Sequence, residues 1–161
     1  MKIHLSRSGA FSIASSIYIM FFLAVNNIVY SSSYPWIIFC VPAFIVWPLA
    51  VCFSRSIVKT PVAFALYACV VMYYAVLNIL TSPGHPWVLY IAFALSWYPF
   101  SVIFAKKGAF GLSIFGLIWS ILFFVTVNLI TTPGNIWAVY PVFAVLWWPL
   151  SVYFFGSKRT F

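Results

Sequence analysis

Three asparagines are the residues of this sequence best placed to do polar chemistry. Asn27, Asn78 and Asn128 are 51 and then 50 residues apart, and each stands nine residues before a tryptophan. A neutral amide both donates and accepts hydrogen bonds, so three amides at one depth would form a polar ring that could line a path or bind a ligand. The alternative interpretation is that each asparagine bonds the carbonyls of a turn or a neighbouring helix.

A second recurring set of side chains is aromatic. The candidate aromatic face consists of Trp36, Trp87, Tyr90, Trp137 and Tyr140. Such a face could surround a lipid, a quinone or a cation, or it could serve only in packing and in anchoring helices at a membrane boundary. Small residues follow each tryptophan at the seventh position, and we expect them to let helices approach closely. They are Ala43, Ala94 and Ala144.

Prolines complete the recurring pattern. Pro48, Pro99 and Pro149 each lie twelve residues after one of the tryptophans, within an apolar stretch. A proline inside a helix removes one backbone hydrogen bond and is expected to kink the helix. Three matched kinks could splay a cytoplasmic vestibule, or they could be the shape that the helices need in order to pack.

Much chemistry is excluded by the absence of acidic residues. The chain contains no Asp or Glu, so it offers no carboxylate proton relay, acid–base pair or carboxylate metal site. The three cysteines have no metal-ligand spacing. We therefore predict no enzymatic activity, no metal and no cofactor. The eight cations are too dispersed for a nucleic-acid surface, so no nucleic-acid partner is expected.

The composition indicates that lipid surrounds most of the chain. Hydrophobic residues make up 66% and charged residues 5% of the sequence, whereas a soluble domain carries about 25% charged residues. Six apolar runs have the length of a transmembrane helix. They cover residues 9–30, 36–54, 61–80, 87–105, 109–130 and 136–155. Because no alternating pattern suggests a β-barrel, we predict an all-α integral membrane protein with six transmembrane helices.

The positive charges predict the orientation of these helices. They fall into four groups: Lys2 and Arg7, Arg55 and Lys59, Lys106 and Lys107, and Lys158 and Arg159. These groups flank the predicted helices at alternate connections, and the other connections contain no Lys or Arg. The positive-inside rule therefore puts both termini in the cytoplasm. We expect the first helix to be retained rather than removed as a signal peptide, because the repeat pattern requires it.

The asparagine, tryptophan and proline positions define three tandem repeat units. The units cover residues 9–55, 60–106 and 109–156 and together form a single membrane domain over 1–161. Each unit is predicted to be a helical hairpin, and all three share one orientation. We predict a pseudo-three-fold arrangement about the membrane normal, with a row of hairpins as the alternative.

The outer turns are predicted from their Pro-Gly sequences. Ser82-Pro83-Gly84-His85 recurs as Thr132-Pro133-Gly134-Asn135, which suits a type II turn with positive φ at the glycine. The first unit has Ser31-Ser32-Ser33-Tyr34 at this place, so its turn is expected to differ.

The third unit, VNLITTPGNIWAVYPVFAVLWWPLSVYFF, resembles the bacterial two-transmembrane-helix domain family. The shared features are an asparagine late in the first helix, a short turn with a tryptophan, and a second helix rich in tryptophan and containing proline. The family's flanking histidines and glycine-rich run are absent here. The resemblance implies a bacterial inner-membrane module that is attached to varied partners.

Three functions are compatible with these residues. The first is an intramembrane interaction module, such as an accessory subunit, an assembly factor or an immunity-type protein that docks on another integral membrane protein. The second is a small channel or facilitator for ions, neutral solutes or lipids, which the asparagine ring would suggest. The third is a sensor that binds a lipid or a quinone through its aromatic face.

Overall fold

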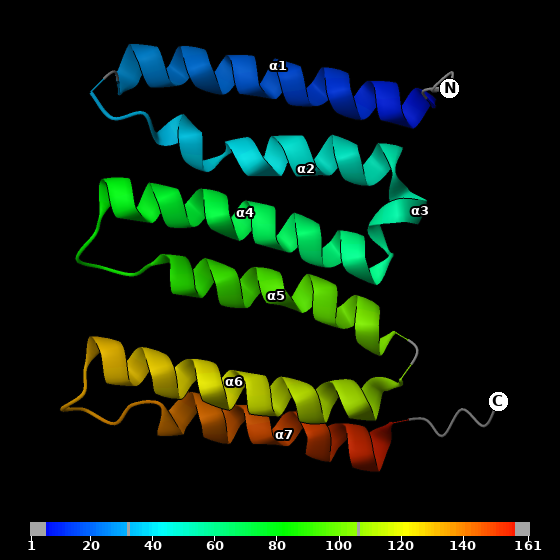
Figure 1. The fold of residues 1–161 in the computed structure, drawn as a ribbon, viewed down its shortest axis with the longest axis vertical. Coiled ribbons are helices and arrows are strands. Elements are labelled where there is room, and N and C mark those ends of the chain that lie inside the picture. Colours follow the sequence, from blue (N-terminus) through cyan, green and yellow to red (C-terminus); the bar gives the residue numbers. More distant parts are fainter. Residues whose placement is uncertain (1–5, 32, 106, 157–161) are drawn as a thin grey trace. The chain divides into compact units, whose positions relative to one another are not determined.

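The computed structural model describes residues 6–31, 33–105 and 107–156. In chain order the helices are α1 (Arg7–Tyr30), the 3-10 turn η1 (Trp36–Phe39), α2 (Val41–Cys52), the short α3 (Ser54–Ile57), α4 (Thr60–Thr81), α5 (Val88–Phe104), α6 (Ala109–Thr131) and α7 (Val139–Phe155) (Figure 1). The chain divides into two compact units, residues 1–76 and 77–161, and the boundary falls inside α4.

The helix lengths agree in part with a membrane protein. Helices α1, α4 and α6 contain 24, 22 and 23 residues and are apolar enough to cross a membrane. At about 1.5 Å per residue, each exceeds a hydrocarbon core of about 30 Å. The returning helices are shorter: α5 and α7 contain 17 residues each, or about 25 Å. The all-helical prediction is confirmed, with three helices of membrane-spanning length.

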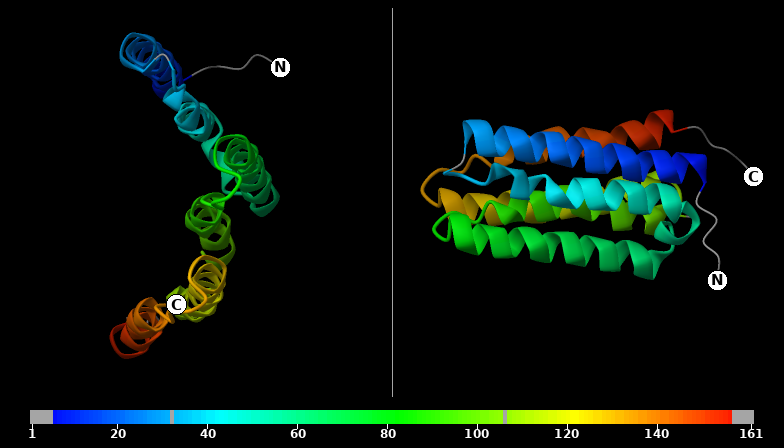
Figure 2. Two further views of the ribbon diagram at one scale, coloured as in Figure 1. Left: turned by 90° about the vertical axis from the view of Figure 1, so that its left-hand side faces the viewer. Right: turned by 90° about the horizontal axis from the view of Figure 1, so that it is seen from above.

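Small residues hold the α1–α2 hairpin of the first unit together. The two helices run antiparallel and pack side by side (Figures 1 and 2). Gly9, Ser12 and Ser16 lie at positions i, i+3 and i+7 of α1 and are buried. Because no long side chains lie between them, the two helix backbones can approach closely. Close approach increases van der Waals contact between the helices, which drives helix association in a membrane.

The second unit repeats this arrangement around α6, which packs against both α5 and α7. Ser113, Gly116 and Ser120 have the same spacing and are buried. Ser12 and Ser113 both lie fifteen residues before a repeated asparagine, as does Ala63 of α4. These three side chains are 2%, 0% and 0% exposed. Helices α1 and α6 therefore carry the small residue at the close helix contacts, and Ala63 is buried at the same position of the repeat in α4.

This finding corrects the prediction made for the alanines that follow the tryptophans. Ala43, Ala94 and Ala144 are all exposed, so they do not provide the close helix contacts. Composition alone could not distinguish the two sets, because both consist of small residues at helical spacing.

Two tyrosines of α4 support the break between η1 and α2. Pro42 has no N–H to bond the carbonyl of Ile38, and the Tyr73 hydroxyl donates to that carbonyl at 2.8 Å. The Tyr74 hydroxyl donates to the carbonyl of Phe39, also at 2.8 Å. The Ile38 carbonyl would otherwise lack the helical partner that Pro42 cannot provide, in apolar surroundings where an unsatisfied group is costly. These bonds attach α4 to the α1–α2 hairpin within the first unit.

Candidate functional site

Each repeated asparagine forms the same three hydrogen bonds, an arrangement we call the asparagine clamp. The Asn27 side chain is 5% exposed. Its Nδ2 donates to the carbonyls of Ser31 and Tyr34, both at 2.9 Å, and its Oδ1 accepts from the N–H of Ile37 at 3.1 Å. The bonded residues lie four, seven and ten positions after the asparagine.

The other two clamps have the same register. Asn78 Nδ2 donates to the carbonyls of Ser82 and His85, both at 2.9 Å, and Oδ1 accepts from Val88 at 3.0 Å. Asn128 Nδ2 donates to Thr132 at 3.0 Å and Asn135 at 2.7 Å, and Oδ1 accepts from Ala138 at 2.9 Å. Both side chains are buried. The repeat is therefore conserved within the chain down to individual hydrogen bonds.

The clamp solves the problem of a turn that folds back beside its own helix. Each asparagine lies three residues before the end of α1, α4 or α6, about one helical turn inside. The returning helix begins at that level, and the Oδ1 satisfies one of its first N–H groups, which have no intrahelical partner. Non-helical backbone at membrane depth must be satisfied by protein groups. The amide side chain provides two donors and an acceptor for this purpose.

These bonds favour turn bracing over path lining. Both hydrogens of each Nδ2 are used inside the asparagine's own hairpin, and the side chains are buried there. An amide that lines a path must keep a donor or acceptor available to the solute. The geometry therefore supports the second of the two interpretations made from the sequence.

The turn itself differs from the type II turn predicted for the Pro-Gly sequences. The N–H of His85 donates to the carbonyl of Ser82 at 3.1 Å, as a four-residue turn requires. Among the described residues, only Gly108 has a positive φ, so Gly84 and Gly134 do not adopt the type II conformation. The prediction of type II turns was therefore wrong.

The expectation of a different first turn was also wrong in its hydrogen bonding. The N–H of Tyr34 donates to the carbonyl of Ser31 at 3.0 Å, matching the other two units. Next, the N–H of Trp36 donates to the carbonyl of Tyr34 at 2.9 Å across Pro35, whose φ of −79° and ψ of 64° define an inverse γ-turn. Because no positive φ is needed, a serine serves where the other units have glycine.

Replacing Gly108 and Gly84 separately by alanine should give opposite results. Gly108 precedes α6 with φ 86° and ψ 162°, a region that is almost restricted to glycine. We expect Gly108→Ala to lower the free energy of unfolding by about 1–3 kcal/mol. Gly84→Ala meets open space and should be neutral or slightly stabilising. Denaturant titration in detergent micelles checks both, and equal losses would contradict the assigned turn conformations.

The candidate aromatic face is divided between packing and exposed positions. The Trp137 Nε1 donates to Thr132 Oγ1 at 2.7 Å, and its ring contacts Phe124 edge to face. Tyr90 contacts Phe123 in the same way, with ring centroids 5.8 Å apart. Trp36 and Trp87 are half-buried, whereas Tyr140 is exposed. These contacts favour packing over an aromatic cavity.

A deeper aromatic cluster in the second unit was not predicted. Trp97 of α5 and Trp148 of α7 lie 5.7 Å apart between ring centroids, and both meet the backbone of α6 at Gly116. The Trp119 Nε1 donates to Ser96 Oγ at 2.9 Å, and Ser96 is almost completely buried. The sequence alone does not predict this cluster, because the contact of Gly116 with two tryptophans depends on which helices pack together.

The prolines lie inside the returning helices. Pro48 is inside α2, Pro99 inside α5 and Pro149 inside α7. Pro99 and Pro149 are buried, so in the second unit these residues take part in packing. Pro99 and Pro149 therefore form part of the packed surface of α5 and α7, whereas Pro48 is half-buried in α2.

Basic residues lie at helix ends. Arg7 begins α1, Lys59 precedes α4, and Lys107 lies between α5 and α6 with its Nζ 5.5 Å from the centre of the Phe104 ring. Lys2, Lys106, Lys158 and Arg159 lie outside the described residues. Within the described ranges, no group of three His or Cys residues could hold a metal ion.

The resemblance to the two-transmembrane-helix domain family stays a prediction. No protein-family model, curated protein or solved structure matches the chain.

Proposed function

We propose that this protein is a non-enzymatic module that docks on another integral membrane protein within the bilayer. The proposal rests on one contrast: polar side chains of this protein are bonded within the chain, whereas large apolar side chains are exposed. Many polar side chains bond their own helices and turns, as Ser113 bonds Phe110, and others bond a neighbouring helix of this chain, as Tyr73 and Trp119 do. What remains for a partner is an exposed surface of large apolar and aromatic side chains.

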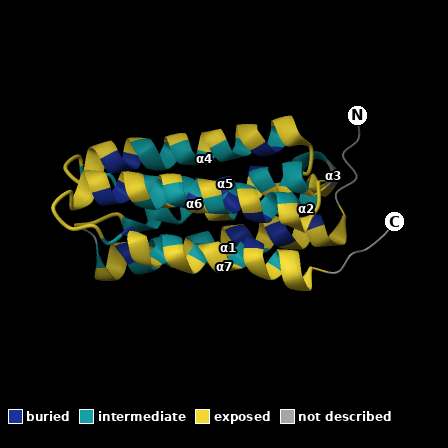
Figure 3. Cartoon of the chain, turned by 90° about the horizontal axis from the view of Figure 1, so that it is seen from below, coloured by how far each residue is buried: buried dark blue, intermediate teal, exposed yellow. Residues whose placement is uncertain are grey.

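Helix α7 presents one regular part of this surface (Figure 3). The aromatic stripe, as we name it, consists of Tyr140, Phe143, Trp147, Leu150 and Phe154. Their spacing of three and four residues places them along one side of the helix. Packed helices in a bilayer interact through such side chains, and aromatic residues provide large rigid contact areas. The stripe thus fits a partner helix.

The proposal includes an arrangement in the membrane. Helices α2, α5 and α7 also cross, which gives six spans and three hairpins about an axis along the membrane normal. Both termini lie in the cytoplasm of a bacterial cell, at the inner membrane. The basic residues at helix ends and the uncharged asparagine turns support this orientation. A cysteine placed at Gly84 or Gly134 should then react with an impermeant maleimide from outside intact cells.

Site-specific photocrosslinking tests the docking. A benzoylphenylalanine at Trp147, in the aromatic stripe, should yield one adduct of discrete mass in native membranes. The same residue at the neighbouring Trp148 should yield none, because Trp148 packs toward Gly116. The absence of an adduct from position 147, or a single adduct at twice the chain mass of 18.3 kDa, would contradict docking on a different protein.

A further inference from the structure

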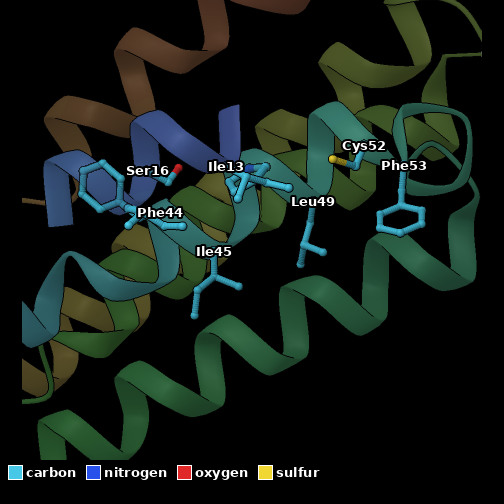
Figure 4. Close-up of a pocket in the computed structure, with 9 residues that line it drawn as sticks. Ile13, Ser16, Phe44, Ile45, Leu49, Cys52 and Phe53 are labelled. Atoms are coloured by element: carbon cyan, nitrogen blue, oxygen red, sulfur yellow. The ribbon is translucent and has the colours of Figure 1, made fainter. Parts of the chain in front are cut away.

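The first unit contains an apolar pocket whose wall includes a polar side chain. The pocket lies along the α1–α2 hairpin and has a volume of about 440 Å³ (Figure 4). Its wall includes Ile13 and Ile17 of α1 and Phe44, Ile45 and Leu49 of α2. Ser16 contributes the one hydroxyl to a lining that is otherwise hydrocarbon apart from the Cys52 thiol.

The Ser16 hydroxyl lacks a hydrogen-bond partner. Ser16 is 5% exposed, and its Oγ is the one buried side-chain N or O atom without a partner in the described part of the chain. Serines in helices usually bond a carbonyl of the preceding turn. Ser12 and Ser15 do so, donating to Gly9 at 2.9 Å and to Phe11 at 2.8 Å. The unused hydrogen-bonding capacity of Ser16 therefore sets it apart from its neighbours.

The repeat shows that Ser16 departs from the pattern. The corresponding residue lies eleven positions before the asparagine in each unit, and it is Tyr67 in the second unit and Leu117 in the third. A serine at this position leaves room where the other units have a large side chain. At this position the first hairpin therefore has a smaller side chain than the other two and a hydroxyl without a partner.

The depth of Ser16 narrows the class of ligand. Ser16 lies nine residues after the start of α1, or about 14 Å along a helix of about 36 Å. The headgroups and ester groups of phospholipids lie outside the hydrocarbon core. A ligand for this hydroxyl must carry its polar atom inside the core. A neutral quinone ring meets this requirement with carbonyl acceptors, and its hydrocarbon chain suits the apolar wall.

We propose that the α1–α2 pocket binds a membrane quinone, with the Ser16 hydroxyl donating to a ring carbonyl. The Ser16 Oγ is itself buried, so donation to a bound ring requires a rotation about the Cα–Cβ bond toward the pocket. The Phe44 ring on the wall provides an aromatic surface for a planar ligand. The proposal concerns binding alone and is independent of docking through the aromatic stripe.

Photolabelling tests the pocket with a defined probe. The protein in lipid nanodiscs is labelled with an azido derivative of decylubiquinone, with unlabelled decylubiquinone as competitor. We expect saturable labelling of residues 13–17 and 44–53. Ser16→Ala keeps the space and removes the donor, so its apparent Kd should rise about 3- to 10-fold. Ser16→Leu introduces the residue of the third unit, fills the pocket and should raise the Kd at least as much.

A matched variant controls for general effects on the protein. Leu117→Ser makes the reciprocal change in the third hairpin and should leave labelling of the first hairpin unchanged. Circular dichroism of each variant verifies the helix content. Undiminished labelling of Ser16→Ala would overturn the role of the hydroxyl. Competition by decane as effective as that by decylubiquinone would overturn the quinone, because any hydrocarbon would then suffice.

Discussion

Replacing Asn128 by leucine is expected to lower the free energy of unfolding by about 2–4 kcal/mol. The substitution removes all three bonds of one clamp, namely those from Nδ2 to the carbonyls of Thr132 and Asn135 and that from the N–H of Ala138 to Oδ1. A single hydrogen bond between membrane helices contributes about 0.6 kcal/mol on average. The larger expected effect comes from losing three bonds together and from leaving the N–H of Ala138 unsatisfied, whereas the carbonyls of Thr132 and Asn135 still accept from the N–H groups of Asn135 and Trp137.

The chain provides a matched control for this substitution. Asn26 is adjacent to Asn27, but its Nδ2 bonds only the carbonyl of Phe22 in the same helix, at 2.8 Å. Asn26→Leu makes the same chemical change outside a clamp and should cost no more than about 0.5 kcal/mol. Asn128→Asp removes both donors and places acceptor oxygens against carbonyls, so it should cost at least as much as leucine.

Two measurements check the clamp, one global and one local. Unfolding by dodecyl sulfate in mixed micelles gives the change in free energy. Hydrogen exchange of the Ala138 amide reports the bond to Oδ1 directly, and its protection should fall in Asn128→Leu before other residues are affected. Equal stability of Asn128→Leu and Asn26→Leu would mean that the clamp does not stabilise the fold.

The clamp also distinguishes docking from solute transport. If the asparagines lined a path, replacing Asn27, Asn78 and Asn128 together by leucine would abolish solute flux in proteoliposomes. If they brace the turns, liposomes with the wild-type protein and liposomes with the triple variant should show the same solute flux. Flux by the wild-type protein, lost in a folded triple variant, would contradict the bracing interpretation.

The repeat pattern predicted the helices well because lipid imposes a simple rule on side chains. Long apolar runs separated by polar turns located α4 and α6 to within one residue. Helix α7 begins three residues later than the predicted start at 136, because the turn continues alongside α6 before the helix starts. Hydropathy does not distinguish this non-helical segment from the helix, because its residues are also apolar.

The asparagine spacing located the clamp but not its partners. The bonded atoms are backbone carbonyls and N–H groups, which every residue has, so the sequence carries no mark of them. Pro-Gly suggested a positive φ that the turn does not use. The pocket at Ser16 was detectable in principle from the repeat alignment, where serine replaces leucine or tyrosine. Its unpartnered hydroxyl required the structure.

Gly116→Ala is the second substitution with a large expected effect. A Cβ at this position would overlap the ring of Trp148 and would lie 2.8 Å from Cη2 of Trp97. Large rigid rings cannot withdraw as a flexible side chain would. Overpacking costs about 1–3 kcal/mol, and disturbing the Trp97–Trp148 contact adds about 0.5–1.5 kcal/mol. The higher helix propensity of alanine returns about 1 kcal/mol, so the net loss should be about 1–3 kcal/mol.

The sign of the change in stability tests this prediction. Gly111 lies on the same helix, and its replacement by alanine is expected to have the opposite effect. A Cβ at Gly111 would lie 3.7 Å from the Phe104 ring, an ordinary van der Waals distance. Gly111→Ala should therefore leave stability unchanged or raise it by up to about 1 kcal/mol. Thermal unfolding followed by circular dichroism compares the two variants, and tryptophan emission reports displacement of the two rings. If Gly116→Ala proved as stable as Gly111→Ala, the two tryptophans could not meet at α6 as described.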